Sequence, residues 1–215
     1  MVCKAAIARI APSALALRVG IASAQTATVD PSYGRIEGDI EVAFGAGAVI
    51  APRGPRAEGE LRFRYLETAG LLATYEDAGA FGAAAEPPRA LILGLELRPL
   101  FLFRWLEGHE TGRARFDLAV DSIGFEMSAV WQQPSGAGFG SQRGFEAALA
   151  VEVPVLERAS GPWIGLRGGL RWSERALGSG AVVGADDWQA IVAFTLAWHQ
   201  VLAVHVVDWG DRAAQ

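Results

Sequence analysis

Cysteine and lysine are almost absent from this sequence. The single cysteine, Cys3, excludes a disulfide framework and a zinc site built from cysteines. Lys4 is the one lysine among 19 basic residues, so the other 18 are arginines. The formal net charge of −5, with no basic face, gives no reason to expect a nucleic-acid partner. A hydrophobic content of 51% with 20% charged residues excludes a disordered chain.

Long apolar runs are missing as well. The two best segments, 91–106 and 190–207, are interrupted by charged or polar residues. They fall short of the roughly 20 consecutive apolar residues that a transmembrane helix needs. The sequence therefore predicts no helix that crosses a membrane.

The first 24 residues have the pattern of an export signal. Lys4 and Arg9 form a positive start, residues 10–22 are mostly apolar, and Ala22-Ser23-Ala24 fits the small-x-small cleavage pattern. A disordered tail or the first helix of a soluble domain is the alternative. Removal of this segment takes away Cys3 and three cations, so the net charge changes from −5 to −8. A thiol-free chain suits an oxidising compartment.

From residue 36 onward, apolar and polar residues alternate with the period of two that is typical of a β-strand. Glu37, Asp39 and Glu41 alternate with apolar residues or glycine, and Arg62 and Arg64 alternate with apolar residues in the same way. A strand places alternate side chains on opposite faces, so each segment has one apolar and one polar face. Eight such segments occur, at 36–44, 58–65, 70–76, 91–98, 123–131, 145–153, 164–172 and 188–199.

The pattern predicts an all-β fold: an antiparallel up-and-down transmembrane β-barrel of about eight strands with a charged interior. The segments are long enough to cross a bilayer at a tilt, and a soluble β-sandwich, the alternative, usually has shorter strands. Aromatic residues gather near the strand ends, as at a membrane interface: Phe44, Tyr65, Tyr75, Trp131, Trp163, Trp172, Trp188 and Trp198. The chain thus divides into a signal (1–24), a lead (25–34), the barrel (35–200) and a C-terminal extension (201–215).

The connections alternate in length, as expected for such a barrel. The second and sixth are short, near 66–67 and 158–160, and are predicted to be periplasmic turns. The third, fifth and seventh, at 78–88, 134–142 and 174–186, are longer and rich in Gly, Ala, Pro and Ser, which suits the outer side. The fourth, at 106–120, is long for a periplasmic turn and predicts a short helix or a strand extension.

On strand period, strand number and export signal, the chain resembles the small eight-stranded outer-membrane barrels of Gram-negative bacteria, the class that includes the transmembrane domain of OmpA. The resemblance covers roughly residues 33–200. It implies an outer-membrane location, contact with outer-membrane lipid, and a structural, adhesive or narrow-passage role without catalysis. A monomer is favoured, and any partner of the outer loops is unknown.

Eight strands leave an interior that side chains can fill, so the inward charges need partners. We expect a structural network in which arginines pair with carboxylates. Its members are Glu37, Asp39, Glu41, Glu58, Glu60, Arg62, Arg64, Glu96, Arg98, Glu126, Glu146, Glu152, Arg167 and Arg171. In this set nine acids face five arginines, and the surplus calls for carboxyls that keep their protons, a bound cation, or water.

No catalytic, cofactor or metal site is predicted. The histidines are His109, His199 and His205, and none stands in a His-x-Ser arrangement; a Gly-x-Ser-x-Gly elbow is also absent. The pair His109-Glu110 is too sparse for a metal. One alternative is a lipid-modifying enzyme that uses His199 with Thr195 on the same face.

The other alternative is a soluble exported barrel that binds a small apolar ligand, with Leu91, Leu93, Leu95 and Leu97 lining its interior. The direction of the two faces discriminates between these readings. The membrane barrel predicts that ten apolar side chains point outward and are largely exposed: Leu61, Phe63, Leu93, Leu95, Leu149, Val151, Leu166, Leu170, Val192 and Phe194.

Overall fold

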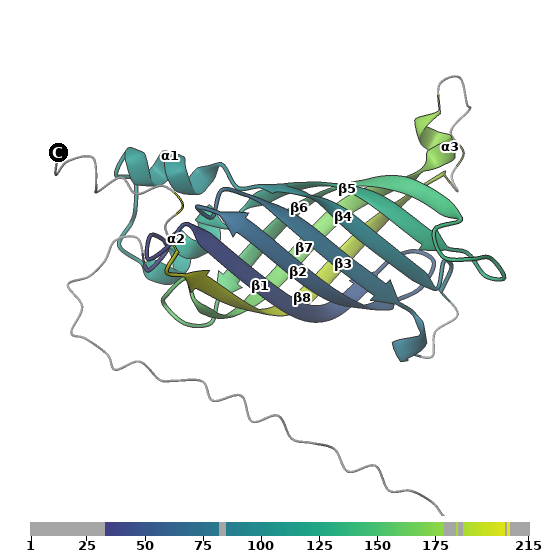
Figure 1. Ribbon diagram of the computed structural model, residues 1–215, viewed down its shortest axis with the longest axis horizontal. Coiled ribbons are helices and arrows are strands. Elements are labelled where there is room, and N and C mark those ends of the chain that lie inside the picture. Colours follow the sequence, from purple (N-terminus) through teal and green to yellow (C-terminus); the bar gives the residue numbers. More distant parts are fainter. Residues whose placement is uncertain (1–32, 82–84, 179–183, 185–186, 205, 207–215) are drawn as a thin grey trace, which may run out of the picture.

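Eight antiparallel strands close into one up-and-down barrel in the computed structural model of the chain (Figure 1). The structure describes residues 33–81, 85–178, 184, 187–204 and 206. The predicted signal therefore lies outside the described residues. The strands are β1 (Ile40–Ile50), β2 (Arg56–Tyr65), β3 (Ala69–Asp77), β4 (Arg89–Leu97), β5 (Gly124–Gln133), β6 (Gln142–Pro154), β7 (Gly161–Ser173) and β8 (Trp188–Leu202). Each strand pairs with its neighbours in sequence, and β8 pairs with β1, so the predicted all-β, antiparallel up-and-down barrel of eight strands is confirmed.

Short helices lie at the two ends of the barrel. We call the end with the β2–β3 turn the inner end; it carries α1 (Leu100–Leu106) and α2 (Ala114–Asp121) (Figure 1). The opposite, outer end carries α3 (Glu174–Leu177) and the 3₁₀ turn η1 (Gly79–Phe81). The fourth connection contains α2, the short helix that is one of the two outcomes predicted for 106–120, whereas α1 is not predicted by the sequence. Among the described residues no helix has the length and apolar content that crossing a membrane would require.

The apolar faces of the strands point outward. Nine of the ten residues predicted to lie outside are exposed, from 39% for Leu170 to 62% for Leu149. The tenth, Val151, is half-buried. Every strand contributes to this surface, so it forms a continuous belt around the barrel, which we call the apolar belt.

The first strand starts later than the alternation predicts. Residues 36–39 precede β1, and Arg35, just before them, is buried at the inner end. The guanidinium of Arg35 lies 4.2 Å over the ring of Phe101 in α1 and contacts Glu110 at 2.8 Å. It also pairs with Asp121 at the end of α2. Ile36 and Glu37 are both exposed and Gly38 and Asp39 are both buried, so the alternation of side chains does not continue into this lead.

The two inner helices are joined to each other by one arginine. Arg104 of α1 contacts Asp117 and Asp121 of α2, both at 2.6 Å. Asp117 also accepts hydrogen bonds from the Tyr33 hydroxyl at 2.9 Å and the Thr111 backbone at 3.0 Å. Although burial opposes ionisation, these donors hold the pKa of Asp117 at about 2.

An apolar cluster beneath the helices closes the inner end of the barrel. Leu118 of α2 packs with Ala159, Trp163 and Val201, and Tyr33 covers the cluster. Trp163 is 2% exposed and donates its indole N–H to the Ala159 carbonyl at 2.8 Å. Trp163 therefore faces inward, so its prediction as a residue of the membrane-interface aromatic set is wrong.

Replacing Asp117→Asn should loosen the inner helices. The amide cannot accept from Arg104, Tyr33 and Thr111 together as a carboxylate does, and hydrogen bonds to a charged group contribute about 1.5–3 kcal/mol each. We expect trypsin to cleave at Arg113 and Arg115 at least about tenfold faster, because local opening becomes more frequent. Equal cleavage rates for the variant and the wild type would contradict this role.

Candidate functional site

The barrel interior is filled by long charged side chains. Among the described residues, eight glutamates, six arginines and His199 point inward and are each less than 9% exposed. The arms rise chiefly from β2, β4, β5, β6 and β7. The inward positions of β1 and β8 are mostly small, and include Gly45, Gly47, Ala193 and Ala197. The small residues of β1 and β8 therefore leave room for the long charged side chains that come from the other strands.

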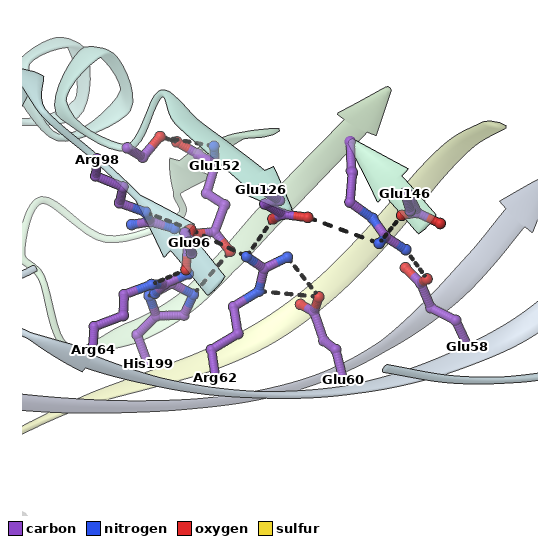
Figure 2. Close-up of polar contacts among 12 residues, drawn as sticks. Glu58, Glu60, Arg62, Arg64, Glu96, Arg98, Glu126, Glu146, Glu152 and His199 are labelled. Carbon is purple, nitrogen blue, oxygen red and sulfur yellow. Dashed lines mark hydrogen bonds and ion pairs between the residues drawn. The ribbon is translucent and has the colours of Figure 1, made fainter. Parts of the chain in front are cut away.

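An inner cluster is formed by Arg64, Arg98 and His199 with Glu41, Glu96 and Glu152. Arg64 contacts Glu96 at 2.8 Å and Glu152 at 3.0 Å (Figure 2). It also pairs with Glu41. Arg98 contacts Glu96 at 2.7 Å and pairs with Glu152. Arginine suits these shared contacts because its planar fork donates to two carboxylates at once.

His199 is held between two carboxylates and an aromatic ring. Its Nδ1 lies 2.8 Å from Glu41 and its Nε2 lies 3.4 Å from Glu152. The imidazole stacks on the Trp163 indole, with ring centroids 4.7 Å apart and an interplanar angle of 15°. An imidazolium fits this place, since both of its ring nitrogens donate.

A middle cluster contains Arg62 and Arg167 with Glu58, Glu60 and Glu126. Arg62 contacts Glu60 at 3.0 Å and Glu126 at 2.6 Å. Arg167 contacts Glu58 at 2.6 Å and lies 3.8 Å from Glu126. Each arginine also reaches an adjacent cluster, because Arg62 lies 3.1 Å from Glu96 and Arg167 lies 2.9 Å from Glu146.

An outer cluster completes the series. Arg171 contacts Glu76 at 2.7 Å and Glu146 at 2.5 Å, and Arg56 contacts Glu76 at 2.8 Å. The three clusters are linked end to end, so ion pairs follow the barrel axis from one end to the other. The arrangement binds strands to one another across the interior.

The structure brings twelve of the fourteen predicted interior residues into these clusters. The two others lie at the inner end. Asp39 is 7% exposed and accepts from the Val206 backbone at 2.6 Å. Glu37 is exposed and precedes β1, so its prediction as an interior residue is wrong. The physical reason is that strand geometry, which alone would turn Glu37 inward, begins only at Ile40.

Three members of the clusters were missed by the sequence prediction: Arg56, Glu76 and His199. Arg56 and Glu76 continue the inward phase of their strands by one step of two residues. His199 shares the inward phase of Thr195 on β8. The period of two was sufficient to find all three.

Glu67 is a buried carboxyl outside the strands. It follows Leu66 in the β2–β3 turn, where the φ angles of the two residues are 48° and 52°, values that non-glycine residues seldom adopt. Glu67 is 8% exposed. Burial, and next the nearby Glu41 charge, raise its pKa to about 8 against the attraction of Arg98 and other arginines.

The site contains no recognisable set of metal ligands. In the part of the chain that the structure describes, no three His, Cys, Asp or Glu side chains are grouped so as to hold a metal ion. Comparison with known proteins adds no family: no family model matches the chain, and no curated protein matches it. What the structure defines is a class by its fold, an eight-stranded up-and-down barrel with a paired, charged interior.

Replacing Arg62→Leu should destabilise the barrel by about 3–5 kcal/mol, the cost of leaving buried carboxylates without their partner. The matched control is Arg115→Leu, because Arg115 is exposed and lies 3.8 Å from the exposed Glu157. Unfolding temperatures from heat-modifiable gel mobility should fall strongly for Arg62→Leu and stay near the wild type for Arg115→Leu. Equal temperatures for the two variants would refute the pairing argument.

Glu67 predicts a pH dependence of stability. A carboxyl whose pKa rises from 4.5 to about 8 on folding stabilises the fold fully below pH 4.5, and this contribution is lost as the pH rises through 8. Glu67→Gln should therefore raise the unfolding temperature at pH 8 and flatten its dependence between pH 5 and 8. Glu157→Gln, at an exposed position, is the control. Parallel curves for the Glu67 variant and the wild type would show that this carboxyl does not titrate with folding.

Proposed function

We propose that this chain is a non-enzymatic β-barrel of the outer membrane, whose interior serves stability and is closed to passage. The apolar belt carries the proposal. Phe44, Leu71, Leu95, Leu149 and Leu196 are each more than 55% exposed, and they come from five different strands. Soluble monomers expose apolar patches of at most a few hundred Å², whereas a belt around a whole barrel matches a hydrocarbon layer.

Aromatic residues border the belt near both ends, which supports contact with lipid headgroups. Toward the outer end lie Tyr75, Trp131, Trp172 and Trp188, with Phe145 stacked on Trp172 at 6.0 Å. Toward the inner end lie Tyr65, Phe125 and Trp198, which are 37–40% exposed. Rings with a polar edge and an apolar face suit the boundary between the two media.

The interior supports a structural role in place of transport. The linked ion pairs cross the barrel at every level, and Leu118 of the inner helix α2 packs on Trp163. Moving an ion through would require separating several buried pairs, each costly to break. A barrel of eight strands leaves little space beyond that which side chains fill.

The two alternatives receive less support. A soluble barrel with an apolar ligand inside requires an apolar lining, but Leu93, Leu95 and Leu97 are exposed on the outside at 42–57%. A lipid-modifying enzyme requires access from lipid to its catalytic groups, but His199 is 1% exposed and enclosed by Glu41, Glu152 and Trp163.

The belt can be tested with two matched substitutions. Leu95 in β4 and Leu177 in α3 are 57% and 56% exposed, but only Leu95 belongs to the belt. Arginine in place of a lipid-facing residue near the bilayer midplane costs about 2–4 kcal/mol. We expect Leu95→Arg to reduce the amount of folded barrel in the outer-membrane fraction of a Gram-negative host, and Leu177→Arg to leave it unchanged.

The same fractionation tests location directly. The wild type should sediment with outer membranes and need detergent for extraction. Recovery of the wild type in the soluble periplasmic fraction, together with equal or better yield of Leu95→Arg, would overturn the proposal.

A further inference from the structure

The middle cluster is a chain of five charged side chains that does not close. In order it runs Glu60, Arg62, Glu126, Arg167 and Glu58, with each arginine placed between two carboxylates. Its two ends, Glu58 and Glu60, lie two residues apart on the inward face of β2 (Figure 2). Neighbouring carboxylates on one face of a strand repel each other unless a positive charge lies between them.

Both ends of this chain carry an unused oxygen. Arg167 donates to Glu58 Oε2 and Arg62 donates to Glu60 Oε2. The other oxygens, Glu58 Oε1 and Glu60 Oε1, have no hydrogen-bond partner among the described residues. The two residues are 4% and 7% exposed, so these oxygens are buried. Glu126 Oε2 is likewise without a hydrogen bond, at 3.8 Å from Arg167. Buried polar atoms without partners are rare and call for an explanation.

The two residues of β1 that pair with these carboxylates are glycines. Gly45 pairs with Glu60 and Gly47 pairs with Glu58 in the β1–β2 register. A Cβ on Gly45 would lie 3.0 Å from Glu60 Oε1, so this oxygen points toward the bare backbone of β1. Thr195 pairs with Gly47 from the other side, and its hydroxyl oxygen would lie 2.3 Å from a Cβ on Gly165 of β7.

Counting the charges in each cluster shows which of the three has more negative than positive charge. In the outer cluster, two arginines face two glutamates. In the inner cluster, Arg64, Arg98 and the imidazolium of His199 face three glutamates. In the middle cluster, Arg62 and Arg167 face three glutamates, which leaves one negative charge over. The surplus charge and three of the unpartnered carboxylate oxygens therefore occur in the same place, while a fourth, Glu152 Oε1 of the inner cluster, lies 3.4 Å from His199 Nε2.

We propose that the barrel interior binds one monovalent cation, Na⁺ or one of its kind, between Glu58 and Glu60 beside the glycine wall of β1. A hard cation prefers carboxylate and water oxygens, and Glu58 Oε1 and Glu60 Oε1 supply the first kind. One unit of charge neutralises the middle cluster. With two carboxylate ligands, the remaining positions of the ion belong to water. The proposal concerns the interior and is independent of whether the apolar belt contacts lipid.

The test compares the barrel, refolded in detergent, in sodium chloride and in N-methyl-D-glucamine chloride of equal ionic strength. The organic cation is too large for a place between two side chains of one strand face. We expect the wild type to unfold about 5 °C higher in the sodium salt, since a ligand that binds only the folded state raises its stability.

Two variants make the test specific. Glu60→Gln removes the surplus charge and keeps an oxygen for Arg62, so its unfolding temperature should be the same in both salts. Glu76→Gln changes the balanced outer cluster, where Glu76 contacts Arg56 and Arg171, so it should lower the temperature in both salts and keep the increment from sodium. If Glu60→Gln does not fold, Glu58→Gln takes its place, with the same expectation.

Two results would overturn the proposal. One is a wild type whose unfolding temperature is equal in the two salts. If that temperature also rises on acidification from pH 8 to pH 5, a proton takes the place of the cation, and the proposal is overturned in the same way. The other is a Glu60→Gln variant that retains the full sodium increment. A chain that folds in buffer without detergent would refute the outer-membrane proposal, and the cation comparison would then be run in buffer.

Discussion

The pairing of buried charge is the constraint on which the rest of this structure depends. An ionised side chain placed in a protein interior costs several kcal/mol unless a partner of opposite charge meets it with good geometry. Here the outward faces of the strands form the apolar belt, so nearly all charged side chains of the strands point into the interior. The barrel stands because six arginines and His199 reach eight glutamates from opposite walls. Strand pairing and side-chain pairing support each other.

The use of arginine and not lysine in the interior follows from the same constraint. An ammonium is a single point of charge, whereas a guanidinium has donors in a fixed plane and can serve two or three carboxylates together. Arg64 does so with Glu41, Glu96 and Glu152, and Arg62 does so with Glu60, Glu96 and Glu126. A lysine in either place would leave carboxylate oxygens without a partner.

The period of two was enough to predict the fold, the outward belt and most of the interior set, because one buried and one exposed face repeat in every strand. The period of two failed where contacts outside the strand ladder determine the position of a side chain. Glu37 alternates correctly but lies before the first ladder of hydrogen bonds, and Trp163 is turned inward to pack on His199 and Leu118. The helices of the fourth connection lack strong local signals, and their position depends on contacts of Arg35 and Arg104 with distant acids. Arg35 reaches its acids across 75 and 86 residues and Arg104 reaches Asp121 across 17, and neither pairing is visible in local sequence.

The small inward residues of β1 and β8 have a consequence for how the cylinder is sealed. Along the junction of these two strands, the groups that carry charge are Glu41 and His199, which contact each other across it at 2.8 Å. Gly47 permits the close approach, since a Cβ there would lie 1.9 Å from the Phe194 carbonyl. The other strands can thus assemble most of their ion pairs as a curled sheet, and joining its edges has to desolvate one such pair. The β1–β8 junction thus closes the barrel with one charged contact between its two edge strands.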